Sequence, residues 1–345
     1  MATTPVYNDV HPEFRLNGFQ LDRDDLCRIA YSFIKEGDEY EKQCGLFLLD
    51  WFDDKPEIGI NTSGTTGAPK TISVSKQAMV NSALATGDFF DLLPGNKALH
   101  CLPTKFIAGK MMFVRGFILG LDLEFVSPSA DPLRYDDRRY DFGALVPLQA
   151  ENAMDRLRNI KKIIIGGAKI NPILEKKLEK IPSEIYETYG MTETITHIAA
   201  KRVGESAFTV LPGVTISHDN ENCLVIHAPR ISSDVIVTND LVELVNENQF
   251  IFLGRRDNVV NSGGIKLIPE QIEAKLSGSI KSRFFVSGVP DESLGEKLVL
   301  FVEGEERQLP DDIFSNLGKY ERPKEIRFIS HFEETGSGKV IRSRV

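Results

Sequence analysis

Residues 62–70, which read TSGTTGAPK, have the side-chain types and the spacing that phosphate binding needs. The two glycines let the backbone approach an anion closely, and the four hydroxyl side chains can donate hydrogen bonds to phosphate oxygens. A Walker loop carries Gly-Lys-Ser/Thr at the start of a helix, whereas here Pro69 precedes the lysine and excludes that arrangement. The sequence therefore predicts a phosphate-binding loop of another kind, with contacts from Thr62, Ser63, Gly64, Thr65, Thr66 and Lys70.

Further short strings follow this loop along the chain. They are GGA at 166–168, YETYGMTE at 186–193, TND at 238–240, GR at 254–255 followed by Asp257, and GK at 338–339. Together with the loop, and in this order, they resemble the motifs of the adenylate-forming superfamily. That superfamily comprises acyl-CoA synthetases, luciferases and the adenylation domains of peptide synthetases. The resemblance covers residues 61–342 and implies an enzyme that activates a carboxylic acid with ATP.

The resemblance also implies roles for the matching residues. The tyrosine of the second string stacks on adenine, Thr192 binds the α-phosphate, Glu193 holds Mg²⁺, and Asp240 accepts hydrogen bonds from the ribose hydroxyls. Asn239 stands where the superfamily usually has glycine. The residues expected to bind ATP or AMP, besides those of the loop, are Gly166, Gly167, Ala168, Tyr189, Gly190, Thr192, Asp240 and Arg255.

The implied chemistry agrees with these residue types. A carboxylate must attack the α-phosphate while diphosphate leaves, so the site has to neutralise two anions with a metal ion, lysine and backbone dipoles. Glu193 suits Mg²⁺, which prefers carboxylate oxygen. Lys339 is a compact positive charge on a flexible stem, and the flanking residues 336–338 (GSG) help it to reach into a cleft. We expect the catalytic residues to be Lys339, Thr192 and Glu193.

The same resemblance implies that one site performs two half-reactions. The acid and ATP first give an acyl-adenylate and diphosphate, and a thiol, usually CoA, then displaces AMP. A small C-terminal domain turns between the two steps about Asp257, a single position able to absorb the backbone change. The predicted domains are residues 1–256, which bind ATP and the acid, and residues 257–345, which rotate and carry Lys339. The residues expected to line the tunnel for CoA are Ser262, Gly263 and Gly264.

The segment after the Leu-Pro pair at 102–103 is expected to line the pocket for the acid. Phe106 stands where many members of the superfamily have histidine, and its ring is able to gate the pocket. Lys105, Lys110 and Arg115 add positive charge to an otherwise apolar segment, which a second carboxylate on the substrate would explain. The alternative, that all three are solvated or paired within the protein, stays open.

Three longer strings narrow the choice of acid. Residues 190–201, 211–217 and 261–273 read GMTETITHIAAK, LPGVTIS and NSGGIKLIPEQIE, and they most resemble the o-succinylbenzoate–CoA ligases of menaquinone biosynthesis. Their substrate is an aromatic keto-acid with two carboxylates, which suits an aromatic and basic pocket. The resemblance therefore implies a ligase that uses ATP, Mg²⁺ and CoA as cosubstrate. The alternatives are another aryl or fatty acyl-CoA synthetase, an adenylation enzyme that loads a separate carrier protein, and a non-catalytic nucleotide sensor.

Strands that alternate with helices must position these residues, which predicts a large N-terminal α/β domain. Residues 162–165 (KIII) predict a strand that ends at the GGA string, and residues 111–119 predict a buried helix. A further helix is expected to begin at Ser75, its N-cap residue, and to end near residue 90. The apolar run Leu46–Leu49 predicts another strand.

Beyond residue 207 the pattern changes to short β-like runs. Residues 234–238 and 241–245 are predicted as separate strands of a β-subdomain, and the residues after Asp257 predict a small, mobile α+β domain. The mixed charge run Arg134–Asp141 is expected to be a solvated loop, and His197 is expected to be a packed or surface histidine and not a catalytic one.

Composition limits the partners of the chain. Its 345 residues carry 41 Lys and Arg against 50 Asp and Glu, and this net charge of −9 argues against a general nucleic-acid binder. No signal peptide is visible, and no apolar run reaches the roughly 18 residues that a membrane span needs. We therefore expect a cytoplasmic protein whose partner is a small-molecule acid, and the sequence does not fix its oligomeric state.

Overall fold

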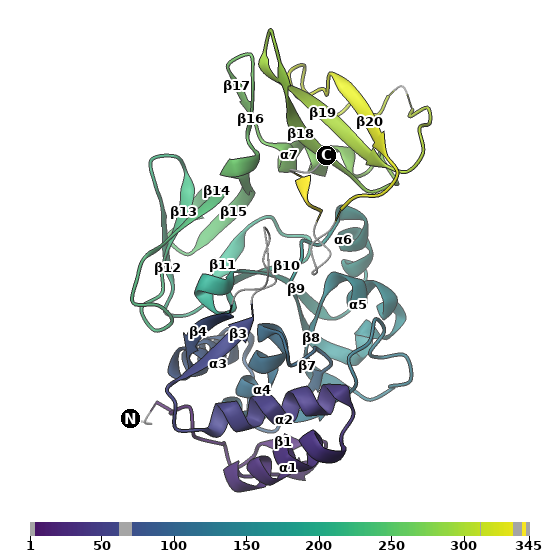
Figure 1. Cartoon of the computed structure of the whole chain (residues 1–345). Helices are drawn as coiled ribbons and strands as arrows, with labels where there is room; N and C mark the ends of the chain where they lie inside the picture. The colour runs from purple at the N-terminus through teal and green to yellow at the C-terminus, as the bar shows by residue number, and fades with distance from the viewer. Residues whose placement is uncertain (1–3, 62–70, 311, 334–339, 343–345) are drawn as a thin grey trace. The chain divides into compact units, whose positions relative to one another are not determined.

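The computed structural model describes residues 4–61, 71–310, 312–333 and 340–342 (Figure 1). The chain divides into two compact units. The first consists of Met1–Ile170, Lys177–Thr215 and His227–Val235, and the second consists of Asn171–Lys176, Ile216–Ile226 and Ile236–Val345. The predicted boundary at Asp257 concerns a rotation between domains, which this division does not test, so that boundary stays a prediction.

A mixed β-sheet forms the centre of the first unit. Its parallel strands lie in the order β9 (Glu184–Gly190), β8 (Ile160–Ile165), β7 (Tyr140–Leu145), β5 (Lys97–His100), β6 (Asp122–Phe125) and β1 (Arg15–Leu16). The antiparallel strands that flank them are β2 (Phe19–Gln20), β10 (His197–Arg202) and β11 (Phe208–Val210). A separate antiparallel hairpin is formed by β3 (Glu57–Asn61) and β4 (Thr71–Ser75).

The strand direction decides where the candidate site residues lie. The end of β8 is an apolar run, as is typical of a parallel strand that is covered on both faces. Since β5, β8 and β9 are parallel, their carboxyl ends meet at one edge of the sheet. The segments that follow these strands, residues 101–106, 166–168 and 191–193, therefore share that edge.

Helices surround this sheet. They are α1 (Arg23–Glu36), α2 (Glu39–Phe52), α3 (Lys76–Phe90), α4 (Ile107–Leu119) and α5 (Pro147–Asn152), with the 3₁₀ helices η1 (Met154–Asn159) and η2 (Thr192–Thr194). Helix α6 (Pro172–Leu178) is divided between the two units and belongs mostly to the second. The predicted N-cap of α3 is confirmed, because the Ser75 side chain accepts a hydrogen bond from the backbone N–H of Ala78. In the described part of the chain, every helix is too short or too polar to cross a membrane.

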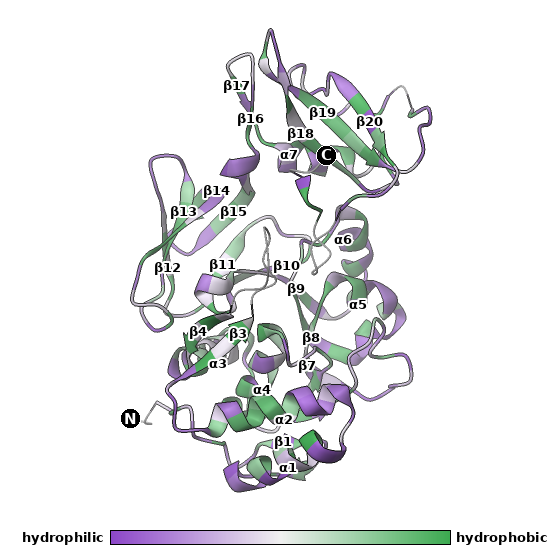
Figure 2. Cartoon of the chain, viewed as in Figure 1, coloured by the Kyte–Doolittle hydropathy of each residue, from purple (hydrophilic) through white to green (hydrophobic). Residues whose placement is uncertain are grey.

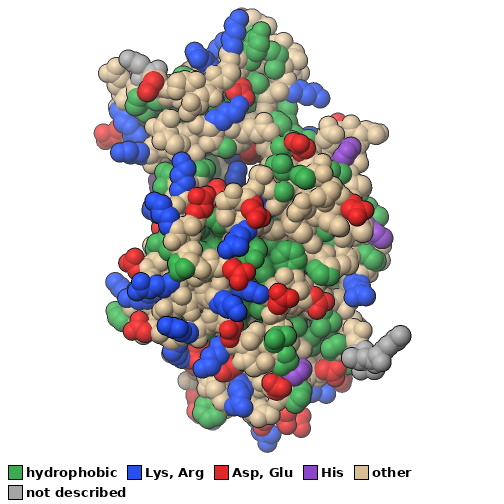
Figure 3. Space-filling view, turned by 180° about the vertical axis from the view of Figure 1, so that it is seen from behind, with side chains coloured by type: hydrophobic (Ala, Val, Ile, Leu, Met, Phe, Trp, Pro, Cys, Tyr) green, Lys and Arg blue, Asp and Glu red, His purple; other side chains and the backbone are tan. Residues whose placement is uncertain are grey.

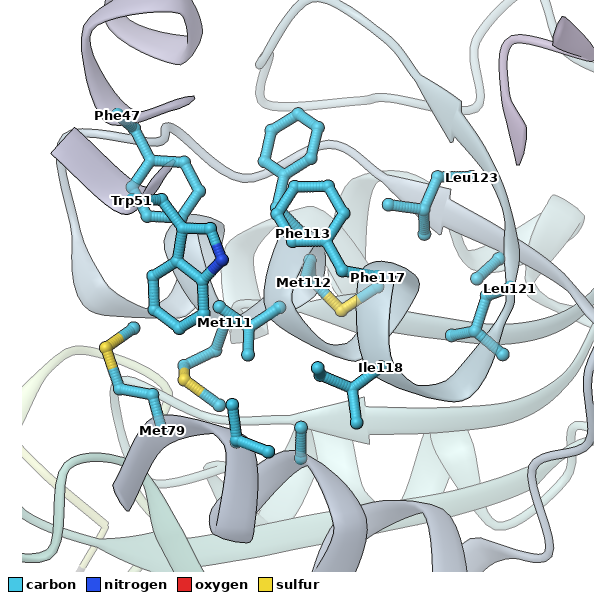
Figure 4. Packing of buried hydrophobic residues seen from close by; sticks show 14 of the residues in the cluster. Phe47, Trp51, Met79, Met111, Met112, Phe113, Phe117, Ile118, Leu121 and Leu123 are labelled. Carbon is cyan, nitrogen blue, oxygen red and sulfur yellow. The ribbon is translucent and has the colours of Figure 1, made fainter. Parts of the chain in front are cut away.

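Helix α4 is the centre of the apolar core in the first unit. Figure 4 shows Phe113 and Phe117 of α4 close to Phe47 and Trp51 of α2, and the ring centroids of Phe47 and Phe113 are 6.0 Å apart. Buried residues occupy nearly every position of α4, so the helix has no polar face, and Figure 2 shows mostly apolar residues along it. This confirms the buried helix that the sequence predicts at residues 111–119.

The strand predicted at Leu46–Leu49 is wrong. These residues lie within helix α2, where Phe47 and Leu48 are buried and Leu46 remains exposed. A four-residue apolar run fits a strand and a buried helix segment equally well, so periodicity over such a short window does not distinguish the two. Tertiary packing against α4 decides between them here.

The second unit contains two antiparallel sheet regions. The first comprises β12 (Thr215–His218), β13 (Cys223–His227), β14 (Ile236–Asn246) and β15 (Gln249–Arg255). The other comprises β16 (Val260–Ser262), β17 (Ile265–Leu267), β18 (Phe284–Asp291), β19 (Gly295–Glu303) and the parallel β20 (Glu325–Ile329). The remaining elements are α7 (Pro269–Leu276) and the 3₁₀ helix η3 (Arg256–Asn258).

The two strands predicted at 234–238 and 241–245 are a single strand, β14. Asn239 and Asp240 interrupt the apolar pattern without ending the strand, because Asp240 pairs with Arg255 of β15 and the register shifts just beyond, between Leu241 and Val242. A bulge of this kind absorbs an irregular sequence within a continuous ladder.

The charge run Arg134–Asp141 is solvated only in part. Tyr135 is 92% exposed, but Asp136 is buried, accepts a hydrogen bond from the Tyr140 hydroxyl at 2.5 Å and pairs with Arg138 at 2.9 Å. These contacts hold the pKa of Asp136 below its ordinary value, despite the opposing effect of burial. Elsewhere on the surface, the face drawn in Figure 3 carries Lys and Arg side chains intermingled with Asp and Glu.

Gly109, in the first turn of α4, provides a test of the packing that positions this helix. A Cβ atom at Gly109 would lie 2.3 Å from the carbonyl oxygen of Pro103, and backbone cannot move aside as a flexible side chain can. We expect Gly109→Ala to lower the free energy of unfolding by about 1–3 kcal/mol, as measured by urea titration. Gly278→Ala, which would place its Cβ in open space, is the control and should be neutral or slightly stabilising. Equal stability of the two variants would contradict this account of α4.

Candidate active site

The GGA string lies directly after β8, at the shared carboxyl edge. A Cβ atom at Gly166 would lie 2.7 Å from the Oγ1 of Thr188, and that hydroxyl donates a hydrogen bond to the carbonyl oxygen of Ile165 at 3.2 Å. Gly167 has a φ of +83°, a conformation that favours glycine, and it is exposed together with Ala168. The ends of β8 and β9 thus pack closely and present an open backbone segment at this edge.

The neighbouring strand β9 brings Tyr189 and Gly190 to the same edge. The Tyr189 ring is half-buried and lies 5.9 Å from the Phe208 ring, which fixes its orientation. A Cβ atom at Gly190 would lie 2.3 Å from the carbonyl oxygen of Thr196, so the chain just beyond η2 returns against the end of β9. The Tyr189 ring therefore lies at the carboxyl edge of the sheet, where it can stack on a planar ligand.

Thr192 and Glu193 lie in η2, exposed, between β9 and β10. The turn behind them is strained, because Ile195 has φ +65° and ψ −57°, and the backbone N–H of Thr196 donates to the carbonyl oxygen of Thr194 at 2.7 Å. This is a γ-turn of the rare form, and a β-branched residue adopts it at a cost of about 1–3 kcal/mol. Since Ile195 is also buried, the surrounding core holds the turn in place.

The donors in this segment suit Mg²⁺. Glu193 offers an exposed carboxylate, which is an oxygen ligand of the kind that Mg²⁺ prefers, and the exposed Thr192 hydroxyl beside it is free to meet a phosphate. Within residues 4–61, 71–310, 312–333 and 340–342, no three His, Cys, Asp or Glu side chains gather as a metal site. A site with one carboxylate fits an ion that is held jointly with the phosphates of a substrate.

A buried polar cluster lies behind this edge, around Arg115 of α4. The Arg115 side chain is 2% exposed, its Nη2 lies 3.5 Å from the Oγ1 of Thr196, and its Nη1 lies 3.6 Å from the sulfur of Met112. Its Nε has no hydrogen-bond partner, and in the described part of the chain no carboxylate forms an ion pair with it. Burial lowers the pKa of Arg115 to about 10, so the guanidinium stays charged at neutral pH. A buried cation without a carboxylate is suited to receive an anion.

Two neutral histidines complete this cluster. His197 lies with its Nε2 3.4 Å from the Oγ1 of Thr86 and its Nδ1 3.3 Å from the Oγ1 of Thr196. Among the described residues His100 has no hydrogen-bond partner, and it packs against the ring of Phe113 with the ring centroids 4.5 Å apart. Burial, and secondarily the charge of Arg115, lowers the pKa of His100 to about 3 and holds that of His197 well below its ordinary value. His197 is therefore packed, which is one of the two placements that the sequence predicts.

The other predicted acid-pocket residues do not converge on Arg115. Lys105 and Phe106 are exposed before α4, with the ammonium group 5.0 Å from the ring centroid. Lys110 is buried, and its ammonium lies 4.8 Å from the ring of Phe47 on α2. Lys110 and Arg115 are separated by about 140° around the helix axis, because successive residues are about 100° apart. The structure thus directs Lys110 toward α2 and Arg115 toward Thr196.

Asp240, Arg255 and Asp257 form a cluster within the second unit. Asp240 is buried, and its backbone N–H donates to the Oγ1 of Thr238 at 3.0 Å. The Nε of Arg255 lies 3.5 Å from the Oδ1 of Asp240, and its Nη2 lies 3.4 Å from the Oδ2 of Asp257. The Asp240 carboxylate is therefore fixed in direction, as an acceptor for ligand hydroxyls would need to be.

The residues predicted for the CoA tunnel form a tight turn. Gly263 and Gly264 connect β16 to β17 with φ values of +60° and +82°, and Ser262 pairs with Ile265 across the hairpin. Positive φ at both central positions is what a two-residue hairpin of this kind requires, and glycine meets it without strain.

Several predicted residues lie outside the described residues. They are Thr62, Ser63, Gly64, Thr65, Thr66, Lys70 and Lys339.

The chain is firmly anchored just beyond Lys339. The guanidinium of Arg342 pairs with the Glu273 carboxylate of α7 at 2.8 Å and donates to the carbonyl oxygen of Val286 at 3.3 Å. Despite this partner, burial raises the pKa of Glu273 above its ordinary value. Sequence reasoning missed this contact of Arg342, because Glu273 lies 69 residues away in the chain and no local pattern links the two.

Thr196, Thr86 and His100 were missed as well. Thr196 lies 81 residues from Arg115 in the chain, and Thr86 lies 111 residues from His197. These contacts depend on the packing of α3 and α4 near β10, and local sequence patterns carry no signal for them.

The two buried histidines make the stability of the first unit depend on pH. The unfolded chain binds protons at both imidazoles near the ordinary pKa of 6.5 and the folded chain does not, so the free energy of unfolding falls as the pH drops below 6.5. We expect His100→Phe to reduce this slope by about 1.0–1.3 kcal/mol per pH unit between pH 5 and about 6, measured by urea titration of Trp51 fluorescence. Phe113→Leu, a change in a buried residue that packs on His100 and does not titrate, is the control and should leave the slope unchanged. An unchanged slope in His100→Phe would contradict the neutral, buried state of His100.

Comparison with known proteins agrees with this geometry. The model of the AMP-binding enzyme family matches residues 54–222, and the model of the AMP-binding enzyme C-terminal domain matches residues 282–339. The 2-succinylbenzoate–CoA ligase of Lactococcus lactis is 24% identical over 331 residues, which are 86% of this chain and 72% of that protein. The ligase of the same name from Listeria monocytogenes is 24% identical and covers 92% of this chain and 74% of its own.

Solved structures are similar over most of the chain. An o-succinylbenzoate CoA synthetase from Bacillus subtilis, in complex with the acyl-adenylate intermediate, has a TM-score of 0.73 at 19% identity and covers 83% of this chain and 68% of its own. An acyl-CoA synthetase (AMP-forming)/AMP-acid ligase II-like protein from Dyadobacter fermentans has a TM-score of 0.63 at 34% identity and covers 92% of this chain and 96% of its own. The chain therefore belongs to the AMP-binding enzyme family, and the resemblance of its motifs to the adenylate-forming enzymes is confirmed.

Proposed function

We propose that the protein is an AMP-forming acid–thiol ligase that converts o-succinylbenzoate, ATP and CoA into o-succinylbenzoyl-CoA, AMP and diphosphate. The observation that carries this proposal is the buried guanidinium of Arg115 beside Thr196. The relatives named 2-succinylbenzoate–CoA ligase support the same substrate. A cytoplasmic location and a small acid as the partner belong to this proposal.

Arg115 favours an acid with a second negative group. Leaving a guanidinium buried without a carboxylate costs several kcal/mol, and a carboxylate of the bound substrate would offset much of that cost. o-Succinylbenzoate has two carboxylates, one to be activated and one to pair with Arg115. The neutral imidazoles of His100 and His197 add no competing charge, and the rings of Phe113 and Phe125 near His100 suit an aromatic substrate.

The chemistry proceeds in two balanced steps. A carboxylate oxygen of the acid attacks the α-phosphorus of ATP, and the bond to the bridging oxygen breaks, so diphosphate leaves. The thiolate sulfur of CoA then attacks the acyl carbon, and the carbon–oxygen bond to AMP breaks. The thiol proton is released to solvent or to a base.

Each group of candidate residues has a separate role in these two steps. Glu193 would hold Mg²⁺, which when bound neutralises phosphate charge during the first step, and Thr192 would bind the α-phosphate. Tyr189 and the GGA string at 166–168 would hold adenine, and Asp240 would accept from the ribose. Lys339 and the loop at 62–70 would bind the phosphates, and the turn at 262–264 would receive the thiol.

The direct test is ATP–diphosphate exchange with a panel of acids, repeated with CoA to detect the thioester. We expect exchange with o-succinylbenzoate and thioester formation on adding CoA. Benzoate and a fatty acid should give little exchange, because neither offers a second carboxylate to Arg115. Exchange with another acid only would contradict o-succinylbenzoate as the substrate and would support the same reaction class. Absence of exchange with every acid of the panel would favour a nucleotide sensor. Transfer to a carrier protein in place of CoA would favour a carrier-loading enzyme.

Arg115→Met tests the role of the guanidinium. For o-succinylbenzoate, kcat/KM should fall at least about 30-fold, which corresponds to the loss of a buried charge pair. For benzoylpropionate, which is the same keto-acid without the ring carboxylate, the substitution should lower kcat/KM much less. The thermal midpoint should hold or rise, because an unpaired buried charge has been removed. Equal losses for both acids would show that Arg115 does not contact the second carboxylate.

A further inference from the structure

The predicted hinge, Asp257, is held by a side chain of strand β14. The Nδ2 of Asn239 donates to the Oδ2 of Asp257 at 3.3 Å, and the same oxygen lies 3.4 Å from the Nη2 of Arg255. Asn239 is half-buried, and it lies on strand β14, which pairs with β15 along its length. The backbone from which the Asn239 side chain extends is therefore held in place. The Asp257 carboxylate is 57% exposed and depends on these donors for its orientation.

The same amide also holds the residue before the hinge. The Nη2 of Arg256 donates to the Oδ1 of Asn239 at 2.5 Å, and its Nη1 pairs with Glu221 beside β13. Asn239 therefore uses its donor toward Asp257 and its acceptor toward Arg256. Of the amino acids of this size, only an amide offers a donor and an acceptor in this way.

On its far side, the hinge segment is tied to α7. The Nδ2 of Asn258 donates to the Oε1 of Glu270, a buried carboxylate in the first turn of that helix. A Cβ atom at Gly254 would lie 2.4 Å from the other oxygen of Glu270, so this contact leaves no room for a side chain there. The segment is thus fastened to β14 before and at Asp257, and to α7 after it.

We propose that Asn239 is a positioning residue that holds Asp257 in one hinge conformation and thereby sets the balance between the two half-reactions. This inference rests on the proposed function, in which the residues after Asp257 turn between adenylation and thioester formation. A change of φ and ψ at Asp257 moves its carboxylate relative to β14, so the bond from Asn239 must break. The bond from Arg256 lies before the pivot and can persist.

The size of the effect follows from the kind of bond. A hydrogen bond of this type, part-exposed and to a charged acceptor, shifts a two-state equilibrium by about two- to tenfold. Asn239 stands where the resembling motif usually has glycine, which offers no side chain. The tether is therefore a feature of this chain, and removing it should change the partition between steps without removing any group that touches substrate.

The experiment compares the two half-reactions in Asn239 variants of the full chain. Asn239→Asp keeps an acceptor for Arg256 and loses the donor to Asp257, and Asn239→Gly loses both. Asn246→Asp, at the other end of β14 where the amide bonds Gln249, is the matched control. The readouts are ATP–diphosphate exchange with o-succinylbenzoate, and CoA-dependent consumption of the purified acyl-adenylate.

We expect the ratio of the two rates to change about two- to tenfold in both Asn239 variants and to stay constant in Asn246→Asp. In an Asp257→Ala background, Asn239→Asp should lose its effect. If both rates change in proportion, Asn239 is only structural and the inference is overturned while the proposed function stands. If the unmodified protein shows neither half-reaction, the proposed function fails and this role fails with it. Asn239→Ser, which keeps a polar side chain, provides the same comparison if Asn239→Gly does not fold.

Discussion

The parallel pairing of β5, β7, β8 and β9 is the constraint on which the rest of the site depends. Parallel strands end at the same edge, so three segments that lie far apart in the chain are brought together without any contact of their own. At that edge Gly167, Ala168, Thr192 and Glu193 are exposed, whereas the end of β8 is buried. The strands of the sheet thus stabilise the fold, and the segments at their carboxyl ends carry the residues expected to bind the substrates.

Close backbone approach then fixes the geometry at this edge. Gly190 packs against the carbonyl of Thr196, and Gly109 packs against the carbonyl of Pro103. The first contact sets the path of the chain after η2, and the second sets the start of α4, which carries Arg115. Because both contacts involve backbone atoms, they leave less freedom than contacts between side chains would. Arg115 and Thr196, whose side chains lie 3.5 Å apart, belong to the two segments that these contacts fix.

Local signals in the sequence were sufficient for much of the fold. The apolar run of β8, the N-cap at Ser75 and the uniformly apolar α4 each follow from residues close together in the chain. The run Leu46–Leu49 and the Asn-Asp pair in β14 were misleading, because packing on α4 and pairing with β15 override local preference. The motif strings at 166–168 and 186–193 include residues that lie at the carboxyl edge, because the direction of β8 and β9 places them there. They gave no sign of the cluster of Arg115, Thr196 and the two histidines, whose contacts join distant parts of the chain.

The γ-turn at Ile195 limits which substitutions can stabilise this protein without affecting Glu193. A buried, β-branched residue in so unfavourable a conformation means that the folded state gives up stability at the point where Glu193 must be presented. Substitutions that relax this turn would strengthen the free protein and loosen the orientation of the carboxylate. Selection for heat resistance and selection for turnover therefore act in opposite directions on this segment. Thermostable variants of this enzyme should gain their stability elsewhere in the core and retain the strained turn.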